Sequence, residues 1–363
     1  MPGLSSFSTD LWASDMIGSY MKYGALSAKA RAMYGKRLRL ADFEHMASLT
    51  DPRDVLDCLR GQPGWSETVS SLSADQGYVG RLELEEALDL QLSRDYESLS
   101  HFVPKEDKAL VAFPVRRREL EEIMAALRGL KSGVREQGTA NPVAGIKVDR
   151  AALHACTNYG ALLAAVRDSI YYPPLHRLTP AQPEALPDYA ATEAILRGAY
   201  YSHLYKTIDQ HYAGETRHVL LKALGEQVDL LNLIYLLRLK TYFPGEDGLT
   251  SVLFPFGYKL KSEKMQALRS AADAEGVFAL LQDTPYTKAL DGLAPTTAAI
   301  EAYYRKSFYQ FNRRQLTAGE PSVYTAVACI TLKELELQAL VNVIESVKYG
   351  VRYDDSFARM AGD

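Results

Sequence analysis

Apolar residues recur at helical spacing along most of the chain, and the most apolar window is Asp229–Phe243, DLLNLIYLLRLKTYF. One face of this segment carries aliphatic residues at i, i+3, i+4 and i+7, namely Leu230, Leu233, Ile234 and Leu237. Further leucines cover much of the remaining surface, and a helix that is apolar on most sides lies in a core. Alternating runs of β-branched residues are nearly absent from the sequence, so the pattern predicts an all-α fold.

The same pattern occurs in two further segments, ELEEIMAALRGLKSG and ELQALVNVIESVKYG. Each copy starts with an acid, Glu119, Asp229 or Glu336, and has apolar residues one, four, five and eight positions later. Each copy also carries a basic residue nine to twelve positions after the acid, and these are Arg128, Lys131, Arg238, Lys240 and Lys348. Asn232 follows the second acid by three positions, where the first copy has Glu122. The chain therefore contains an internal repeat.

Two further features recur before each repeated acid and support the same alignment of the three copies. Glu85, Glu193 and Glu301 are 108 residues apart and precede the repeated acids by 34, 36 and 35 residues. Each repeat also opens with a sequence that predicts two short helices. A period near 108 is too long for a solenoid repeat. We therefore expect three tandem helical domains at 22–133, 148–245 and 258–352, with a lead-in at 1–21 and a tail at 353–363.

Composition and charge narrow the class of protein. The 363 residues are 47% hydrophobic and 24% charged, with a formal net charge of −4. An acidic chain gives no reason to expect a nucleic-acid partner. Cys58, Cys156 and Cys329 are far apart and form no CxxC pair, which favours a reducing compartment. The N-terminal residues lack the basic and apolar regions of a secretory signal, and no segment is apolar enough to predict a membrane span.

Common catalytic motifs are absent from the sequence. It contains no GxxxxGK[ST], GxSxG or HExxH motif, so a nucleotide site of a common type is not expected. Glu215 and His218 have the i, i+3 spacing of a di-iron ligand pair, but such centres need two of these motifs and two further glutamates. We therefore expect this pair to be helix surface, and we predict no catalytic residue, cofactor or metal.

The repeated acids and bases allow two interpretations. The acids could be general bases around a shared cavity. Alternatively, acids near helix starts and bases near helix ends would complement the helix macrodipole, and Thr331 and Glu334 have the spacing of a capping box before the third copy. An acid and a base nine residues apart point to opposite sides of a helix, which favours the structural interpretation.

Two other groups of residues are candidates for contact with a partner. Tyrosine is enriched at protein interfaces, and the tyrosine pairs include Tyr200 and Tyr304. Arg116, Arg117 and Arg118 form a basic cluster that could contact an acidic partner or anionic lipid. Packing at the edge of a core and a solvated helix start are the simpler explanations.

Several motifs resemble one family, the C subunits of V/A-type rotary ATPases, which are called d in eukaryotes. GEQVDLLNLIYLLRLKTYF is similar to the segment of this family in which an acid precedes Asn and then Arg-x-Lys. ITLKELELQALVNVIESVKYGV resembles the C-terminal signature of the family, and YMKYGALSAKARAMYGKRLRLADFEHM resembles its opening. The resemblance runs from about Tyr20 to Val351. It departs from the pattern at Glu122, where the second copy has Asn232.

The resemblance implies a funnel of three similar helical domains with pseudo-threefold symmetry. It implies a non-catalytic, cytoplasmic protein without cofactors that is peripheral to the membrane. Such a protein joins the proteolipid rotor ring to the central shaft, passes torque between them, and is a monomer within the complex. Two alternatives from other classes remain: a soluble helical scaffold unrelated to rotary motors, and a helical metalloenzyme that uses Glu215 and His218.

Overall fold

The computed structural model describes residues 6–70, 81–133, 146–182, 184–243, 253–254, 256–294 and 296–361. Every regular element within these ranges is a helix, which confirms the predicted all-α class. The chain divides into two compact units. Unit 1 comprises Met1–Val115, Gln137–Ile146 and Tyr309–Asp363, and unit 2 comprises Arg116–Glu136 and Lys147–Phe308. The three-domain arrangement stays a prediction.

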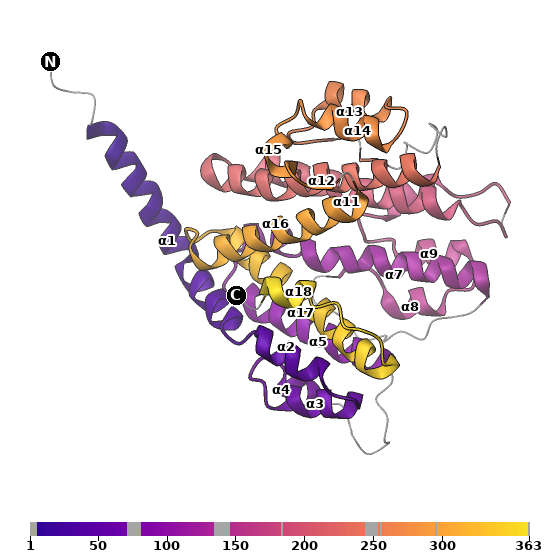
Figure 1. The fold of residues 1–363 in the computed structure, drawn as a ribbon, viewed down its shortest axis with the longest axis horizontal. Coiled ribbons are helices and arrows are strands. Elements are labelled where there is room, and N and C mark those ends of the chain that lie inside the picture. The colour runs from indigo at the N-terminus through magenta and orange to yellow at the C-terminus, as the bar shows by residue number, and fades with distance from the viewer. Residues whose placement is uncertain are drawn as a thin grey trace. The chain divides into compact units, whose positions relative to one another are not determined.

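Unit 1 is organised around one long helix, α17 (Val323–Tyr349) (Figure 1). This helix packs against α1 (Ser6–Tyr34), α2 (Leu40–Ala47), α3 (Pro52–Arg60), α5 (Arg81–Ser100), α6 (Lys108–Val111) and α18 (Ser356–Ala361). The unit also contains α4 (Ser66–Ser70) and the 3₁₀ helix η2 (Lys105–Asp107). Every residue from Val323 to Leu332 is buried, as expected for a helix that is apolar on most sides.

The ends of α17 differ from the sequence-based expectation. The helix begins after Ser322, which forms a capping box with Thr325, and it ends at Gly350, whose φ of 62° is in the left-handed region that favours glycine. The capping box predicted at Thr331 and Glu334 is therefore wrong. Both residues lie inside the helix and are buried, because the apolar stretch that precedes them continues the same helix.

Unit 2 is built from helices of very different lengths. The long ones are α11 (Tyr189–His211) and α12 (Gly214–Tyr242). The short ones are α8 (Arg150–Ala155), α9 (Tyr159–Ala165), α10 (Tyr172–Arg177), α13 (Ser262–Arg269), α14 (Ala274–Leu281) and α15 (Thr287–Leu290). Helix α7 (Phe113–Ser132) starts in unit 1 and continues into unit 2. Helix α16 (Thr297–Thr317) starts in unit 2 and ends in unit 1.

Asp or Asn caps several of the short helices. The side chains of Asp51, Asp149, Asn158 and Asp273 each accept a hydrogen bond from a backbone N–H in the first turn of α3, α8, α9 and α14. Such a cap stabilises a helix start by about 1 kcal/mol. The short helices therefore carry their own start signals, although their positions depend on the long helices on which they pack.

Each unit has a core in which short helices cover the C-terminal half of a long one. In unit 1, Phe43, Met46 and Leu59 from α2 and α3 pack with Leu340 and Val343 of α17. In unit 2, residues of α13 and α14 pack with the second half of α12, namely Met265, Leu268, Val277 and Leu281 with Leu230, Leu233 and Leu237. None of the described helices is long and apolar enough to cross a lipid bilayer.

Phe43 tests the first of these cores, because its side chain is completely buried. We expect Phe43→Ala to lower the free energy of unfolding by about 3–5 kcal/mol, since it removes apolar burial and leaves a cavity. Phe102→Ala is the matched control: this side chain is 44% exposed, and we expect a change within about 0.5 kcal/mol. Urea unfolding followed by circular dichroism measures both, and equal losses would show that α2 does not depend on this contact.

Candidate functional site: three buried carboxylates

The three repeated acids are among the most buried polar residues of the described chain. Glu119 is 1% exposed, Asp229 is not exposed, and Glu336 is 6% exposed. They lie within α7, α12 and α17 and beyond the first turn of each helix. Because macrodipole stabilisation falls off within the first turn, the interpretation of these acids as helix-start charges is wrong. Their role must come from what each carboxylate contacts.

Asp229 accepts hydrogen bonds from four donors in unit 2. Its Oδ1 accepts from the backbone N–H of Tyr258 at 2.8 Å, and its Oδ2 accepts from those of Lys259 at 2.7 Å and Leu260 at 3.1 Å. The phenol of Tyr286 donates to Oδ2 at 2.9 Å. Burial raises the pKa of Asp229, and the backbone donors partly oppose that shift. The carboxylate thus fixes the segment that leads into α13 onto the middle of α12.

Two glycines allow this close approach. A Cβ on Gly225 would lie 2.4 Å from the Cβ of Tyr258, and a Cβ on Gly257 would lie 2.1 Å from the carbonyl oxygen of Leu260. Neither distance is possible without a backbone shift. The close contact at Asp229 therefore requires glycine at position 225 on α12 and at position 257 in the segment that passes over this helix.

Glu336 has an equivalent arrangement in unit 1. Its Oε1 accepts from the backbone N–H of Leu38 and from the indole N–H of Trp65, both at 2.9 Å. Its Oε2 lies 3.4 Å from the ammonium group of Lys333, which in turn lies 3.6 Å from the centroid of the Trp65 ring. Leu38 directly precedes Arg39, the N-cap residue of α2. The carboxylate thus fixes the entry to α2 onto the middle of α17.

Glu119 repeats the contact in unit 2 with fewer partners. It accepts a hydrogen bond from the backbone N–H of Lys147, two residues before Asp149, which caps α8. Burial raises the pKa of Glu119 to about 7, opposed mainly by the Lys147 hydrogen bond and the charge of Arg116.

The three contacts follow one rule. Each acid binds the backbone at the entry to a pair of short helices: Glu119 for α8 and α9, Asp229 for α13 and α14, and Glu336 for α2 and α3. We call these three contacts the carboxylate joints. The first two acids bind the chain that follows them, and the third binds the start of the first repeat. Sequence reasoning identified the acids but missed their donors, because backbone N–H groups carry no residue signal.

The position three residues after the acid also contacts this entry segment. The amide of Asn232 donates to the carbonyl of Phe254 at 3.3 Å and accepts from its N–H at 2.8 Å. In the first copy, Glu122 pairs instead with Arg150 of α8 at 2.7 Å. The first copy therefore has an ion pair at the position where the second copy has the asparagine contact.

Arg128 and Arg238, nine residues after their acids, lie on the other side of their helices and have different partners. Arg128 donates to the phenol of Tyr189 at 2.6 Å, at the start of α11, and Arg238 pairs with Glu301, near the start of α16. The ammonium group of Lys348 lies 5.2 Å from the centroid of the Tyr349 ring. Acid and base therefore form no dyad, and in unit 2 the two arginines contact the next long helix along the chain.

The candidate partner-contact residues are partly or fully buried within the chain. Tyr200 is 8% exposed and packs edge-on against Tyr201, which favours core packing, and its role in partner contact stays a prediction. The phenol of Tyr304 accepts from the amide of Gln227 at 2.9 Å, and its ring stacks on Phe308. Arg116, Arg117 and Arg118 are half-buried in the first two turns of α7.

Glu215 and His218 are exposed in the first two turns of α12. Within the described ranges, no group of three or more His, Cys, Asp and Glu side chains is arranged to hold a metal ion. The three repeated carboxylates, Glu119, Asp229 and Glu336, instead accept hydrogen bonds from backbone N–H groups. Their chemistry is that of structural hydrogen-bond acceptors, and the fold is that of an all-helical protein with buried carboxylates in both units.

Comparison with known proteins identifies the family. Residues 26–356 match the ATP synthase (C/AC39) subunit family, and the chain belongs to this family. The chain is similar to the C subunit of the A-type ATP synthase of Methanothermobacter thermautotrophicus, with 22% identity over 88% of this chain and 82% of the relative. It is also similar to the same protein of Methanobrevibacter smithii, with 22% identity over 86% and 81%.

The corresponding protein of Methanosphaera stadtmanae is 23% identical over 74% of this chain and 67% of the relative. These relatives are named as subunits of an ATP synthase, and the chain is accordingly a non-catalytic subunit of a rotary ATPase. The two alternatives, a scaffold unrelated to rotary motors and a helical metalloenzyme, are therefore wrong.

Asp229→Asn tests the second carboxylate joint. Asparagine offers one acceptor oxygen, and its NH₂ group would face at least one of the donors that both carboxylate oxygens now satisfy. We expect the free energy of unfolding to fall by about 2 kcal/mol or more. Asp291→Asn, at an exposed position of unit 2, is the control and should change it by less than about 0.5 kcal/mol. Equal stability of the two variants would contradict a structural role for Asp229.

The raised pKa of Glu119 predicts a pH dependence. Its pKa is about 7 in the folded chain and about 4.5 when exposed. Between these values the folded chain holds a proton that the unfolded chain has lost, so the contribution of Glu119 to stability falls as the pH rises from 4.5 through 7. We expect the stability difference between wild type and Glu119→Gln to decrease by about 1–3 kcal/mol from pH 5 to pH 8.

Urea unfolding at intervals across this pH range measures the difference. Glu121→Gln is the matched control, because Glu121 lies on the same helix and is exposed. Its difference from wild type should not vary with pH in this way. A constant difference for Glu119→Gln would show that the carboxyl group titrates at its ordinary value in the folded chain.

Proposed function

We propose that this protein is the central-stalk adaptor of a V/A-type rotary ATPase. In this role it sits on the cytoplasmic side of the membrane rotor ring, receives the foot of the central shaft, and rotates with both as a monomer. It passes torque between the ring and the ATP-hydrolysing head during proton or sodium transport. The observation that carries the proposal is the family match over residues 26–356.

The carboxylate joints support this role on physical grounds. A part that transmits torque must resist deformation between its two attachment surfaces. Close-packed helical cores deform little, and hydrogen bonds to a buried charge are stronger than neutral ones. Each joint restrains the chain at the entry to a pair of short helices, where the backbone would otherwise depend on loop contacts alone.

The order of the joints also supports the three-domain organisation, which we keep as part of the proposal. The acid of the first repeat binds the entry of the second, that of the second binds the entry of the third, and that of the third binds the entry of the first. Contacts in this cyclic order are those that three similar domains around an axis would make. Domains at 22–133, 148–245 and 258–352 would then be linked in a closed series.

Partner recovery tests the proposal. We expect affinity-tagged chain, expressed in its native host and purified from gently solubilised membranes, to recover the proteolipid ring and the shaft proteins in stoichiometric amounts. Tagged Asp229→Asn should recover less of both, because a weakened joint reduces the folded population available for assembly, whereas tagged Asp291→Asn should match wild type. Crosslinking mass spectrometry on the same material would identify the contact faces and test Arg116–Arg118 and Tyr304 as contact residues.

Two results would contradict the proposal. One is an intact rotary ATPase from the same membranes that lacks this chain. The other is recovery of the chain with peripheral-stalk proteins in the absence of ring and shaft.

A further inference from the structure

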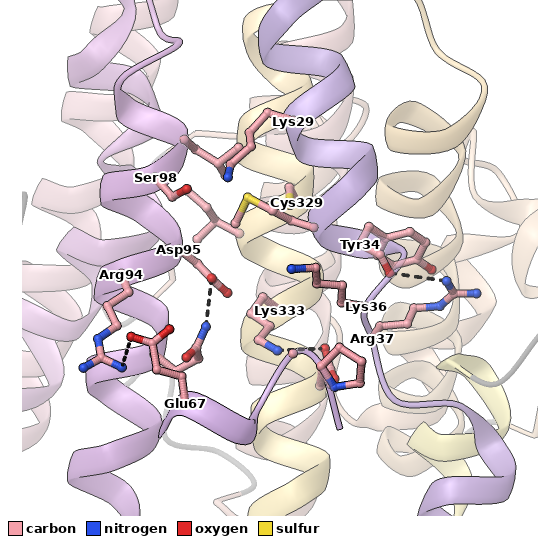
Figure 2. A pocket seen from close by; sticks show the side chains of 17 residues that line it. Lys29, Tyr34, Lys36, Arg37, Glu67, Arg94, Asp95, Ser98, Cys329 and Lys333 are labelled. Atoms are coloured by element: carbon pink, nitrogen blue, oxygen red, sulfur yellow. Dashed lines mark hydrogen bonds and ion pairs between the residues drawn. The ribbon is translucent and has the colours of Figure 1, made fainter. Parts of the chain in front are cut away.

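A pocket of about 260 Å³, lined by several charged side chains, lies within unit 1 next to the Glu336 joint. Its walls come from the C-terminal part of α1 and the chain that follows it, from α5, and from the middle of α17 (Figure 2). The volume has room for several water molecules. It is therefore large enough for a small polyatomic ligand.

The walls of the pocket are positively charged. They carry five cationic side chains, Lys29, Lys36, Arg37, Arg94 and Lys333, and three acidic ones, Glu67, Asp95 and Glu336. Glu336 is already committed to Leu38, Trp65 and Lys333. Asp95 accepts from the amide of Gln91 at 2.9 Å, and burial raises its pKa. Counting every group as ionised, the lining keeps two positive charges in excess.

Two of the cations form no close ion pair. Among the described residues, no carboxylate lies within ion-pair distance of Lys29 or Lys36, and Lys29 acts on Asp95 only through its charge, which lowers the pKa of that carboxyl. Figure 2 shows both side chains in the pocket wall, Lys29 from α1 and Lys36 from the chain just after it, on either side of Cys329. Lys29 is half-buried and Lys36 is exposed, and partial burial of the Lys29 ammonium group without a close partner is unfavourable. A bound anion would remove this cost.

Arg37 offers a further unused donor. Its guanidinium group lies over the ring of Tyr34, 4.2 Å from the centroid, and its Nη1 donates weakly to the Tyr34 carbonyl at 3.4 Å. Its Nε is buried and has no hydrogen-bond partner. Stacking on Tyr34 thus fixes the orientation of a guanidinium group whose donors are not all used.

We propose that this pocket binds a small phosphate-type anion, such as inorganic phosphate or pyrophosphate, through Lys29, Lys36 and Arg37. The two excess positive charges match a doubly charged oxyanion. Lysine and arginine are the usual partners of phosphate in proteins.

Ligand binding would act on the neighbouring joint. Lys36 and Arg37 directly precede Leu38, whose N–H binds Glu336. An anion held by these two residues would restrain the same segment that the third carboxylate joint restrains. Because a ligand that binds only the folded state stabilises it by mass action, occupancy should raise the melting temperature of the chain.

The test is a titration of the purified full chain with sodium phosphate and sodium pyrophosphate. Isothermal titration calorimetry gives Kd and thermal melting gives the shift in Tm, both against sodium chloride and sodium acetate at the same ionic strength. We expect saturable binding with either phosphate probe, an increase in Tm, and no comparable effect of the other two salts. We expect Lys29→Gln with Lys36→Gln to raise Kd about tenfold or more.

The matched control is Lys105→Gln with Lys108→Gln, because both lysines are exposed in unit 1 and neither lines the pocket. It should leave Kd unchanged. If the double pocket variant does not fold by circular dichroism, Lys36→Gln alone replaces it, since Lys36 is exposed and makes no described ion pair.

Any of three results would overturn the proposal. These are an absence of saturable phosphate binding, an equal loss of affinity in the pocket and control variants, and a rise in Tm with acetate that matches the rise with phosphate. The last result would show that the pocket takes a carboxylate, such as an acidic side chain of a partner.

Discussion

A buried carboxylate must be paired with donors, and this requirement organises both units of the protein. Removing an ionised acid from water costs several kcal/mol unless hydrogen bonds replace its hydration. Asp229 meets the requirement with three backbone N–H groups and a phenol, and Glu336 meets it with a backbone N–H, an indole and an ammonium group. In each case the backbone donors lie at the entry to a pair of short helices, so the acid restrains where that entry lies on the long helix.

This arrangement explains how short helices are held on long ones. Helices of six to nine residues are marginal in isolation, and those of α2, α3, α8, α9, α13 and α14 fall in this range. Asp or Asn caps fix the local start of α3, α8, α9 and α14, and the apolar cores fix the faces that pack, but neither prevents an entry segment from sliding along the long helix. A directional hydrogen bond to one carboxylate does, and this supports the proposed role of the protein as a stiff connection in a rotary machine.

The repeated acid and the arginine nine residues after it make separate contacts from the same helix. On α12, Asp229 and Asn232 bind the entry segment, whereas Arg238 binds Glu301 on α16. On α7, Glu119 and Glu122 bind Lys147 and Arg150, whereas Arg128 binds Tyr189 on α11. Opposite sides of one helix thus contact two successive parts of the chain. The anion pocket of unit 1 lies beside the third joint, where a ligand could add to the same restraint.

The sequence by itself determined the helical class, the three copies of one apolar pattern, and the family resemblance that the comparisons confirm. These follow from local periodicity, which depends only on which residues share a helix face. The burial of Glu119, Asp229 and Glu336 inside their helices was not determined in this way, and it replaced the expected helix-start role. Their partners are backbone N–H groups of Lys147, Lys259 and Leu38, which every non-proline residue carries and no sequence pattern marks. Only the tertiary structure could choose among them, because that choice depends on which segment of chain passes over each acid.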